Sequence, residues 1–180
     1  HEPSRRQRQM CIRDRLATVY CDRFHFADKA LIFGDAAHAI VPFFGQGMNA
    51  SFQDCTVIDS LIKRYNGSWN DVFSEFSNIH VPNGHAIANM ALENYIEMRD
   101  SVNDPIFKKR REIEFELEKK FSNRFIPRYS MVSFHDLPYS KVYKRGETQL
   151  KLIDQYLSKR LSKDQLYDSV MNDLSPIESG

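Results

Sequence analysis

The alternation of apolar and polar residues divides the chain into a short strand-forming part and a long helical part. Residues 18–21 and 29–33 are short apolar runs, and the second is almost entirely apolar, which is typical of a buried strand. From 50 to 65, apolar residues recur with the spacing of an amphipathic helix, and Asn66-Gly67 provides a stop signal. The pattern therefore predicts two strands followed by a helix.

The next part of the chain predicts three more helices. Ser68 can cap a helix over roughly 70–80, and Pro82 is expected to open the following one. Asn103-Asp104-Pro105 interrupts the pattern before a strongly charged helix over about 105–121. The charges of this last helix have mixed signs, which predicts a solvated face with i,i+4 pairs.

The C-terminal third predicts a loop followed by two helices. Residues 125–134 are apolar and aromatic and contain a proline, so we expect a loop that crosses the core. Two helical patterns follow from Gly146. We find no internal repeat and no low-complexity segment. The fold class is therefore α-rich α/β, in which a helical lobe follows the last strands of a sheet.

Composition excludes several classes of protein. The chain has 180 residues, of which 42% are hydrophobic and 27% charged, as expected of a globular protein, and its net charge of +1 provides no field for binding nucleic acid. No apolar run approaches the roughly 20 residues of a membrane span. Cys11, Cys21 and Cys55 are too few and too widely separated for a disulfide framework or a zinc site. We expect Cys55 to be a small buried residue.

The first fifteen residues differ from the rest of the chain. They are basic and lack apolar periodicity. A targeting or nucleic-acid-binding arm is one interpretation. We prefer a disordered or non-native extension and leave residues 1–15 out of the fold prediction.

The segment from Gly34 to Asn49, with the sequence GDAAHAIVPFFGQGMN, carries the clearest functional signal. An acid directly after a strand, here Asp35, lies where open α/β sheets bind their ligands and can hold a ribose-like hydroxyl. Gly45 and Gly47 let the backbone approach a ligand at the start of a helix, where free N–H groups favour an anionic or electron-rich group. We identify no catalytic triad, paired carboxylates or metal-ligand cluster.

This segment resembles the second flavin-binding motif of FAD-dependent aromatic hydroxylases. Residues 27–49 are most similar to the kynurenine 3-monooxygenase family. The resemblance implies that Asp35 holds the ribityl chain of FAD and that small Ala36 leaves room for the cofactor. It also implies that backbone N–H groups of Met48 and Asn49 face the flavin ring. The implied cofactor-binding residues are Asp35, Ala36, Pro42, Gly45, Gly47, Met48 and Asn49.

His38 and the two phenylalanines of the same segment each have two interpretations. His38 could act as an acid–base group, but we expect it to brace the turn through hydrogen bonds. Phe43 and Phe44 would cover the flavin face and exclude water, or would simply form a hydrophobic turn.

Two further segments are similar to the same family. Residues 93–99 (ENYIEMR) resemble a helix whose asparagine contacts the amino-acid end of the substrate, and residues 125–134 (FIPRYSMVSF) resemble a segment whose tyrosine hydroxyl reaches it. The alternatives are a surface or capping role for Asn94 and a satisfied core tyrosine for Tyr129. The implied substrate-binding residues are Asn94, Tyr129, Phe43, Phe44 and Met98.

The resemblance implies an NADPH- and FAD-dependent monooxygenase of tryptophan catabolism that uses O2 to hydroxylate L-kynurenine to 3-hydroxykynurenine. The Gly-x-Gly-x-x-Gly turn with which these enzymes begin is not in this sequence. We therefore expect a C-terminal portion that needs an N-terminal half for activity. Residues 16–66 would belong to the FAD-binding domain, at the end of its Rossmann-like sheet, and residues 67–180 to a helical lobe that contributes to the substrate pocket.

Two alternatives remain open. A truncated, non-catalytic paralogue could act as an interaction module, or the enzyme could hydroxylate another aromatic such as a phenol or salicylate. The resemblance places the protein in the cytoplasm or at the mitochondrial outer membrane, although no anchor is visible in the sequence.

Overall fold

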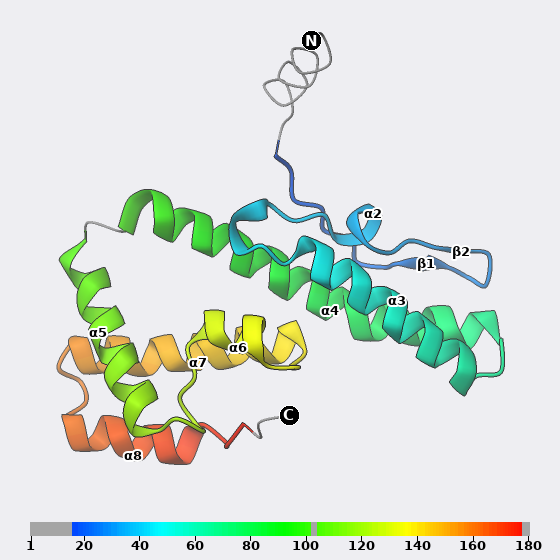
Figure 1. Cartoon of the computed structure of the whole chain (residues 1–180). Coiled ribbons are helices and arrows are strands. Elements are labelled where there is room, and N and C mark those ends of the chain that lie inside the picture. The colour runs from blue at the N-terminus through cyan, green and yellow to red at the C-terminus, as the bar shows by residue number, and fades with distance from the viewer. Residues whose placement is uncertain (1–15, 102–103, 178–180) are drawn as a thin grey trace, which may run out of the picture.

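The computed structural model describes residues 16–101 and 104–177 and is dominated by helices (Figure 1). The small sheet and the many helices confirm the α-rich α/β prediction. The elements in chain order are β1 (His25–Phe26), β2 (Ala30–Leu31), α2 (Asp35–His38), the 3-10 helix η1 (Pro42–Phe44), α3 (Gly47–Arg64), α4 (Trp69–Ile96), the π-helical segment η2 (Glu97–Ser101), α5 (Pro105–Lys120), α6 (Arg128–Phe134), α7 (Tyr139–Leu157) and α8 (Lys163–Asp173).

The sheet of the described residues is a two-stranded antiparallel hairpin, in which His25 pairs with Leu31. The strand expected over 29–33 is therefore present but shorter. The strand expected over 18–21 is wrong. In that segment the Val19 N–H donates to the carbonyl of Ala39, so the chain is held by the loop after α2 instead of by a strand.

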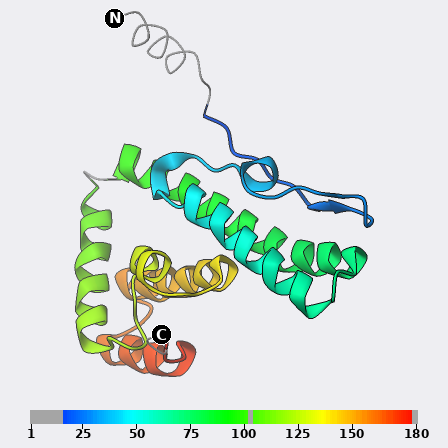
Figure 2. The ribbon, with the colours of Figure 1, turned by 45° about the vertical axis from the view of Figure 1, so that its right-hand side comes forward.

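Helices α3 and α4 run side by side, and the hairpin lies on the opposite side of this pair from α7 and α8 (Figures 1 and 2). The helix predicted over 50–65 is confirmed as part of α3. Its inward face is formed by Ala50, Asp54 and Leu61. Cys55 lies on the other side and is exposed, so the expectation that it is buried is wrong. Phe52 shares that outer side and is 64% exposed.

Helix α4 continues without interruption through Pro82, so the prediction of two separate helices is wrong. Pro82 itself is exposed, whereas Asn83 and Gly84 beside it are buried. The Asn83 amide donates to the carbonyl of Ile79 at 3.0 Å, and its side-chain oxygen accepts from the N–H of Ser140. Packing of α4 against both α3 and α7 thus outweighs the local cost of proline in a helix.

In the C-terminal lobe, α5 and α8 confirm two predicted helices, α6 was not predicted, and α7 begins earlier than predicted. The helix expected over 105–121 is α5, which Asp104 caps through the N–H of Ile106. The loop expected over 125–134 is wrong, because residues 128–134 form α6. Helix α7 begins before Gly146, and a Cβ at that glycine would lie 2.8 Å from Cδ of Arg128. Close packing of α6 on α7 explains both the helical conformation of residues 128–134 and the earlier start of α7. This packing cannot be predicted from the local sequence.

Three apolar clusters hold these elements together. One lies between the hairpin, α2, α3 and α4, one between η1, α4, α6 and α7, and one between α5, α7 and α8. None of the helices in the described ranges is both long and apolar enough to cross a membrane. The boundary at residues 66 and 67 stays a prediction, and the predicted extension over 1–15 lies outside the described residues.

Replacing Pro82 with alanine should stabilise the chain. Alanine restores the backbone N–H that proline lacks and removes the clash of the proline ring with the preceding turn. Because the side chain of Pro82 is exposed, the change creates no cavity. We expect the free energy of unfolding in urea to rise by about 1–3 kcal/mol. Glu75→Ala on the same helix controls for helix propensity, and an unchanged or lower midpoint for Pro82→Ala would contradict the prediction.

Candidate functional site

The turn between β2 and α2 presents an acid to solvent. Gly34 has φ of 59°, which favours glycine, and a Cβ there would lie 3.3 Å from Oγ of Ser51 in α3. Helix α2 begins at the next residue, Asp35, whose side chain is exposed. The contact with Ser51 places this acid beside the first turns of α3.

The start of α3 is the second part of this site. Gly45 ends η1 with φ of 69°, and its N–H donates to the carbonyl of Pro42. No side chain caps the N-terminus of α3, because the Gln46 side chain accepts from the Asn49 amide instead. Met48, 69% exposed, and Asn49 lie on the surface of this first turn. An uncapped helix N-terminus has backbone N–H groups that a ligand can use.

Behind this turn lies a buried ionic group that sequence reasoning missed. Asp54 is only 1% exposed, and its Oδ2 accepts at 2.7 Å from both the Gly34 N–H and Nε2 of His38. Its Oδ1 lies 2.8 Å from Nδ1 of His80, although these two atoms are not aligned as a hydrogen bond. His38 therefore braces the turn, as its structural interpretation predicted. The sequence did not identify Asp54, because a single acid within an amphipathic helix is normally assigned to its solvent-exposed face.

The ionisation of this group follows from burial and contact. Burial alone would raise the pKa of Asp54, but its contacts with His38, His80 and the Gly34 N–H hold that pKa well below its usual value. Burial alone would lower the pKa of His38, but the hydrogen bond to Asp54 and the charge of that carboxylate raise it. The pair is therefore an ionised carboxylate beside a histidine that retains its proton more readily than usual.

A second cavity gathers three of the predicted substrate residues. Phe44, Asn94 and Tyr129 line it together, although they come from η1, α4 and α6. The Asn94 amide donates to the carbonyl of Phe43 at 2.6 Å, which ties the end of α4 to η1. The rings of Phe44 and Tyr129 pack with centroids 5.6 Å apart.

The other two predicted substrate residues do not line this cavity. The ring of Phe43 packs against Tyr95, with centroids 4.5 Å apart. Met98 is 58% exposed, and its sulfur lies 3.8 Å from the Asn94 amide nitrogen. Their substrate roles stay predictions.

Charged residues that the sequence analysis did not select line the same cavity. Arg111 lies 2.8 Å from Glu114 and 3.6 Å from Glu97, which joins α5 to η2. Burial raises the pKa of Glu114, and the neighbouring Arg111 opposes that shift. The interpretation of the 105–121 helix as a solvated face with paired charges fits Arg111, which is 41% exposed and pairs with Glu114 on the same helix, but it is wrong at Glu114, which burial affects most. Its mixed charges gave no sign of which ones turn inward.

A further network includes Arg128, which also lines this cavity. Arg128 forms an ion pair with Glu93, and the Tyr143 hydroxyl donates to the other oxygen of that carboxylate at 2.8 Å. Burial and the hydrogen bond to Glu93 raise the pKa of Tyr143 to about 12. Because Glu93 precedes Asn94 and Arg128 precedes Tyr129, the network connects the two walls of the cavity.

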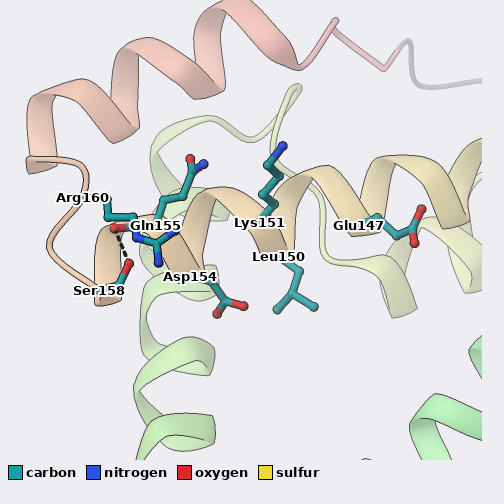
Figure 3. Close-up of a pocket in the computed structure, with 7 residues that line it drawn as sticks. All are labelled: Glu147, Leu150, Lys151, Asp154, Gln155, Ser158 and Arg160. Carbon is teal, nitrogen blue, oxygen red and sulfur yellow. Dashed lines mark hydrogen bonds between the residues drawn. The ribbon is translucent and has the colours of Figure 1, made fainter.

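A larger hollow lies elsewhere, at the C-terminal end of α7. Its volume is about 530 Å³, compared with about 60 Å³ for the cavity at Asn94. Its lining residues project from α7 and from the turn that follows it (Figure 3). Asp154, one of them, forms an ion pair with Arg110. None of the predicted site residues lines this hollow, so size alone does not identify the functional site.

Comparison with known proteins first defines the class. The family model described as "FAD binding domain" matches residues 5–71. That range contains the Gly34–Asp35 turn and the start of α3. The chain therefore contains part of an FAD-binding domain.

The particular relatives are kynurenine 3-monooxygenases. The protein of that name from Myxococcus xanthus is 47% identical over 131 residues, which cover 73% of this chain and 28% of that protein. Those from Sus scrofa and Cytophaga hutchinsonii are 42% and 41% identical and cover 79% and 80% of this chain. The predicted resemblance to this family is confirmed. The chain spans 28–32% of the length of these relatives.

The stability of the chain should depend on pH through His38 and Asp54. His38 has a pKa raised above 6.5, so its contribution is complete below that value and disappears as the pH rises through its folded pKa. Asp54 has a pKa lowered from 3.8, so its contribution is complete above that value and disappears as the pH falls. The free energy of unfolding should therefore decline on both sides of about pH 4–6.5.

Urea denaturation between pH 5 and 9 checks the upper side of this prediction. His38→Gln should remove the alkaline decline, whereas His85→Gln, at a half-buried position of α4, should leave it in place. A decline of the same size in His38→Gln would mean that other groups cause it.

Proposed function

We propose that this chain forms part of an FAD- and NADPH-dependent monooxygenase that hydroxylates L-kynurenine to 3-hydroxykynurenine. The observation that carries the proposal is the pairing of exposed Asp35 with the uncapped start of α3, inside the segment that matches an FAD binding domain. The names of the relatives support the choice of substrate.

The exposed residues of the turn suit the cofactor. Asp35 would accept a hydrogen bond from a ribityl hydroxyl, and Ala36 beside it leaves space for the chain to pass. The N–H groups of Met48 and Asn49 would face the flavin, where a helix N-terminus stabilises negative charge on the reduced ring. Pro42, Gly45 and Gly47 shape the connecting backbone. When bound, FAD would supply the redox chemistry, with NADPH as reductant and O2 as the oxygen source.

The cavity at Asn94 would form one wall of the substrate site. Its volume of about 60 Å³ is far below the roughly 300–1,000 Å³ typical of small-ligand sites, so these residues do not form a complete pocket. An amide, a phenol and charges of both signs suit a zwitterionic amino acid. No side chain is required as a general base, because the anilino nitrogen of the substrate activates its ring. Phe44, buried beside Tyr129, would help exclude water.

Exposed apolar side chains of this region would suit contact with a polypeptide that contributes the remaining part of the domain. Phe26 of β1, Phe33 just after β2, and Met48 and Phe52 of α3 are all exposed apolar residues. Such residues favour burial against further protein. The same exposed side chains would also serve the runner-up function, a non-catalytic interaction module.

The sequence of the native transcript upstream of Leu16 separates these two functions. An in-frame strand, Gly-x-Gly-x-x-Gly turn and helix would support the monooxygenase. A message that begins just before Leu16 would leave the interaction module.

Asp35→Asn should weaken FAD binding while the fold is retained. A hydrogen bond to a charged group contributes roughly 1.5–3 kcal/mol, so we expect the Kd for FAD to rise about 10-fold to 150-fold. Flavin fluorescence titration of the purified native polypeptide measures this change. Asp59→Asn, an exposed acid on α3, is the matched control. Equal affinity in Asp35→Asn and wild type would exclude the proposed role.

Tyr129→Phe should weaken substrate binding without reducing flavin content. Loss of one neutral hydrogen bond, about 0.5–1.5 kcal/mol, corresponds to a rise of roughly 2-fold to 12-fold in the Kd for L-kynurenine. Calorimetric titration of the flavin-loaded protein checks it, with Tyr156→Phe in the C-terminal cluster as control. Asn94→Ala is a less specific test of substrate binding, because it also removes the hydrogen bond to the Phe43 carbonyl. A phenol or salicylate that binds more tightly than L-kynurenine would favour the other aromatic substrates.

A further inference from the structure

We infer that Asp54 is the positioning residue of the flavin-binding turn: its buried carboxylate holds both ends of α2, so that Asp35 between them points outward. This inference rests on the proposed FAD site. Asp54 itself is buried and is not expected to contact the cofactor.

One carboxylate oxygen fixes both ends of the short helix. Oδ2 accepts from the N–H of Gly34, which precedes α2, and from Nε2 of His38, its last residue, each at 2.7 Å. Only four residues form α2, and a helix of one turn has no stability of its own in water. Its shape therefore depends on contacts from outside, and Asp54 provides one at each end.

The surroundings keep the two histidines in place. The ring of His80 stacks on Phe76 with centroids 4.5 Å apart, and the ring of His38 packs against Phe24 at 5.8 Å. A Cβ at Gly84 of α4 would lie 3.0 Å from Cβ of His38, so α2 approaches α4 as closely as packing permits. Each histidine can therefore approach the carboxylate only in a narrow range of orientations.

The charged and titratable groups around Asp54 come from every neighbouring element. His38 belongs to α2 and His80 to α4, and Tyr139 of α7 lines the same small cavity. The charge of Asp35 also acts on His38. Asp54 carries a buried negative charge, and its replacement by an uncharged amide would leave the Gly34 N–H and the His38 ring with at most one, weaker acceptor oxygen. We expect the resulting loss of stability to be concentrated in the turn around α2. It should exceed the loss caused by removing an ordinary surface contact.

Asp54→Asn tests the inference through the Gly34 amide. We expect hydrogen exchange of that amide, followed by NMR with 15N-glycine labelling, to accelerate at least 10-fold beyond the change in global stability. Val170→Ala, a core substitution in distant α8, serves as the control and is compared at equal global stability. Exchange at Gly34 that stays as slow in Asp54→Asn as in this control would overturn the inference.

FAD affinity supplies the second readout. Asp54→Asn should raise the Kd for FAD at least 10-fold with Asp35 intact, whereas Val170→Ala should leave it unchanged at the same loss of thermal stability. An equal rise in both variants would reduce Asp54 to a purely structural residue. Failure of the wild-type native polypeptide to bind FAD would refute the proposed function, and the Gly34 measurement would still decide the positioning role.

A measurement without substitution covers the case in which Asp54→Asn does not fold. A scalar coupling through the hydrogen bond, from the 15N of Gly34 to the carboxyl 13C of Asp54, should be detectable in the wild-type chain. Its absence, with couplings resolved for other backbone hydrogen bonds, would overturn the inference.

Discussion

The burial of α4 on two sides is the constraint on which the rest of the structure depends. This helix contributes to the apolar cluster with α3 and the hairpin and to the cluster with η1, α6 and α7. Its two-sided burial keeps it continuous through Pro82, and it supplies His80 to one part of the site and Asn94 to the other. These clusters bury apolar area on opposite faces of one helix. Displacement of α4 would therefore remove the hydrophobic stabilisation of both clusters at once.

The local sequence predicted the elements whose signals are local. Helix α5 follows from the Asp104-Pro105 start and helical periodicity, and most of α3 follows from its apolar spacing up to Asn66-Gly67. Pro82 and Gly146 misled the prediction because both are unfavourable inside isolated helices. At each, tertiary packing decides the outcome, through the close approach of α6 to Gly146 and the burial around Pro82. Cys55 was placed on the wrong face because an apolar residue on an outer helical face resembles one that faces the core.

The site divides in the same way. Motif resemblance selected Asp35, Asn94 and Tyr129, and the fold places the last two on one cavity with Phe44. Asp54 could not be selected, because a lone acid on a helix normally faces solvent. Arg111 could not be selected either, because it stands in a run of charged residues that the sequence does not distinguish. Their roles arise from partners far away in the sequence, such as Gly34 for Asp54 and Glu97 for Arg111. Identification of such residues needs the tertiary arrangement, which no spacing in the sequence encodes.

The continuity of α4 also fixes a distance within the molecule. His80 and Asn94 lie fourteen residues apart on one unbroken helix, which corresponds to about 21 Å along its axis. Insertion of one residue between them would lengthen this span by about 1.5 Å and turn Asn94 by about 100° relative to His80. Asn94 would then lose the Phe43 carbonyl while Asp54 kept His80. The separation of the two parts of the site is therefore set by the length of a single helical segment.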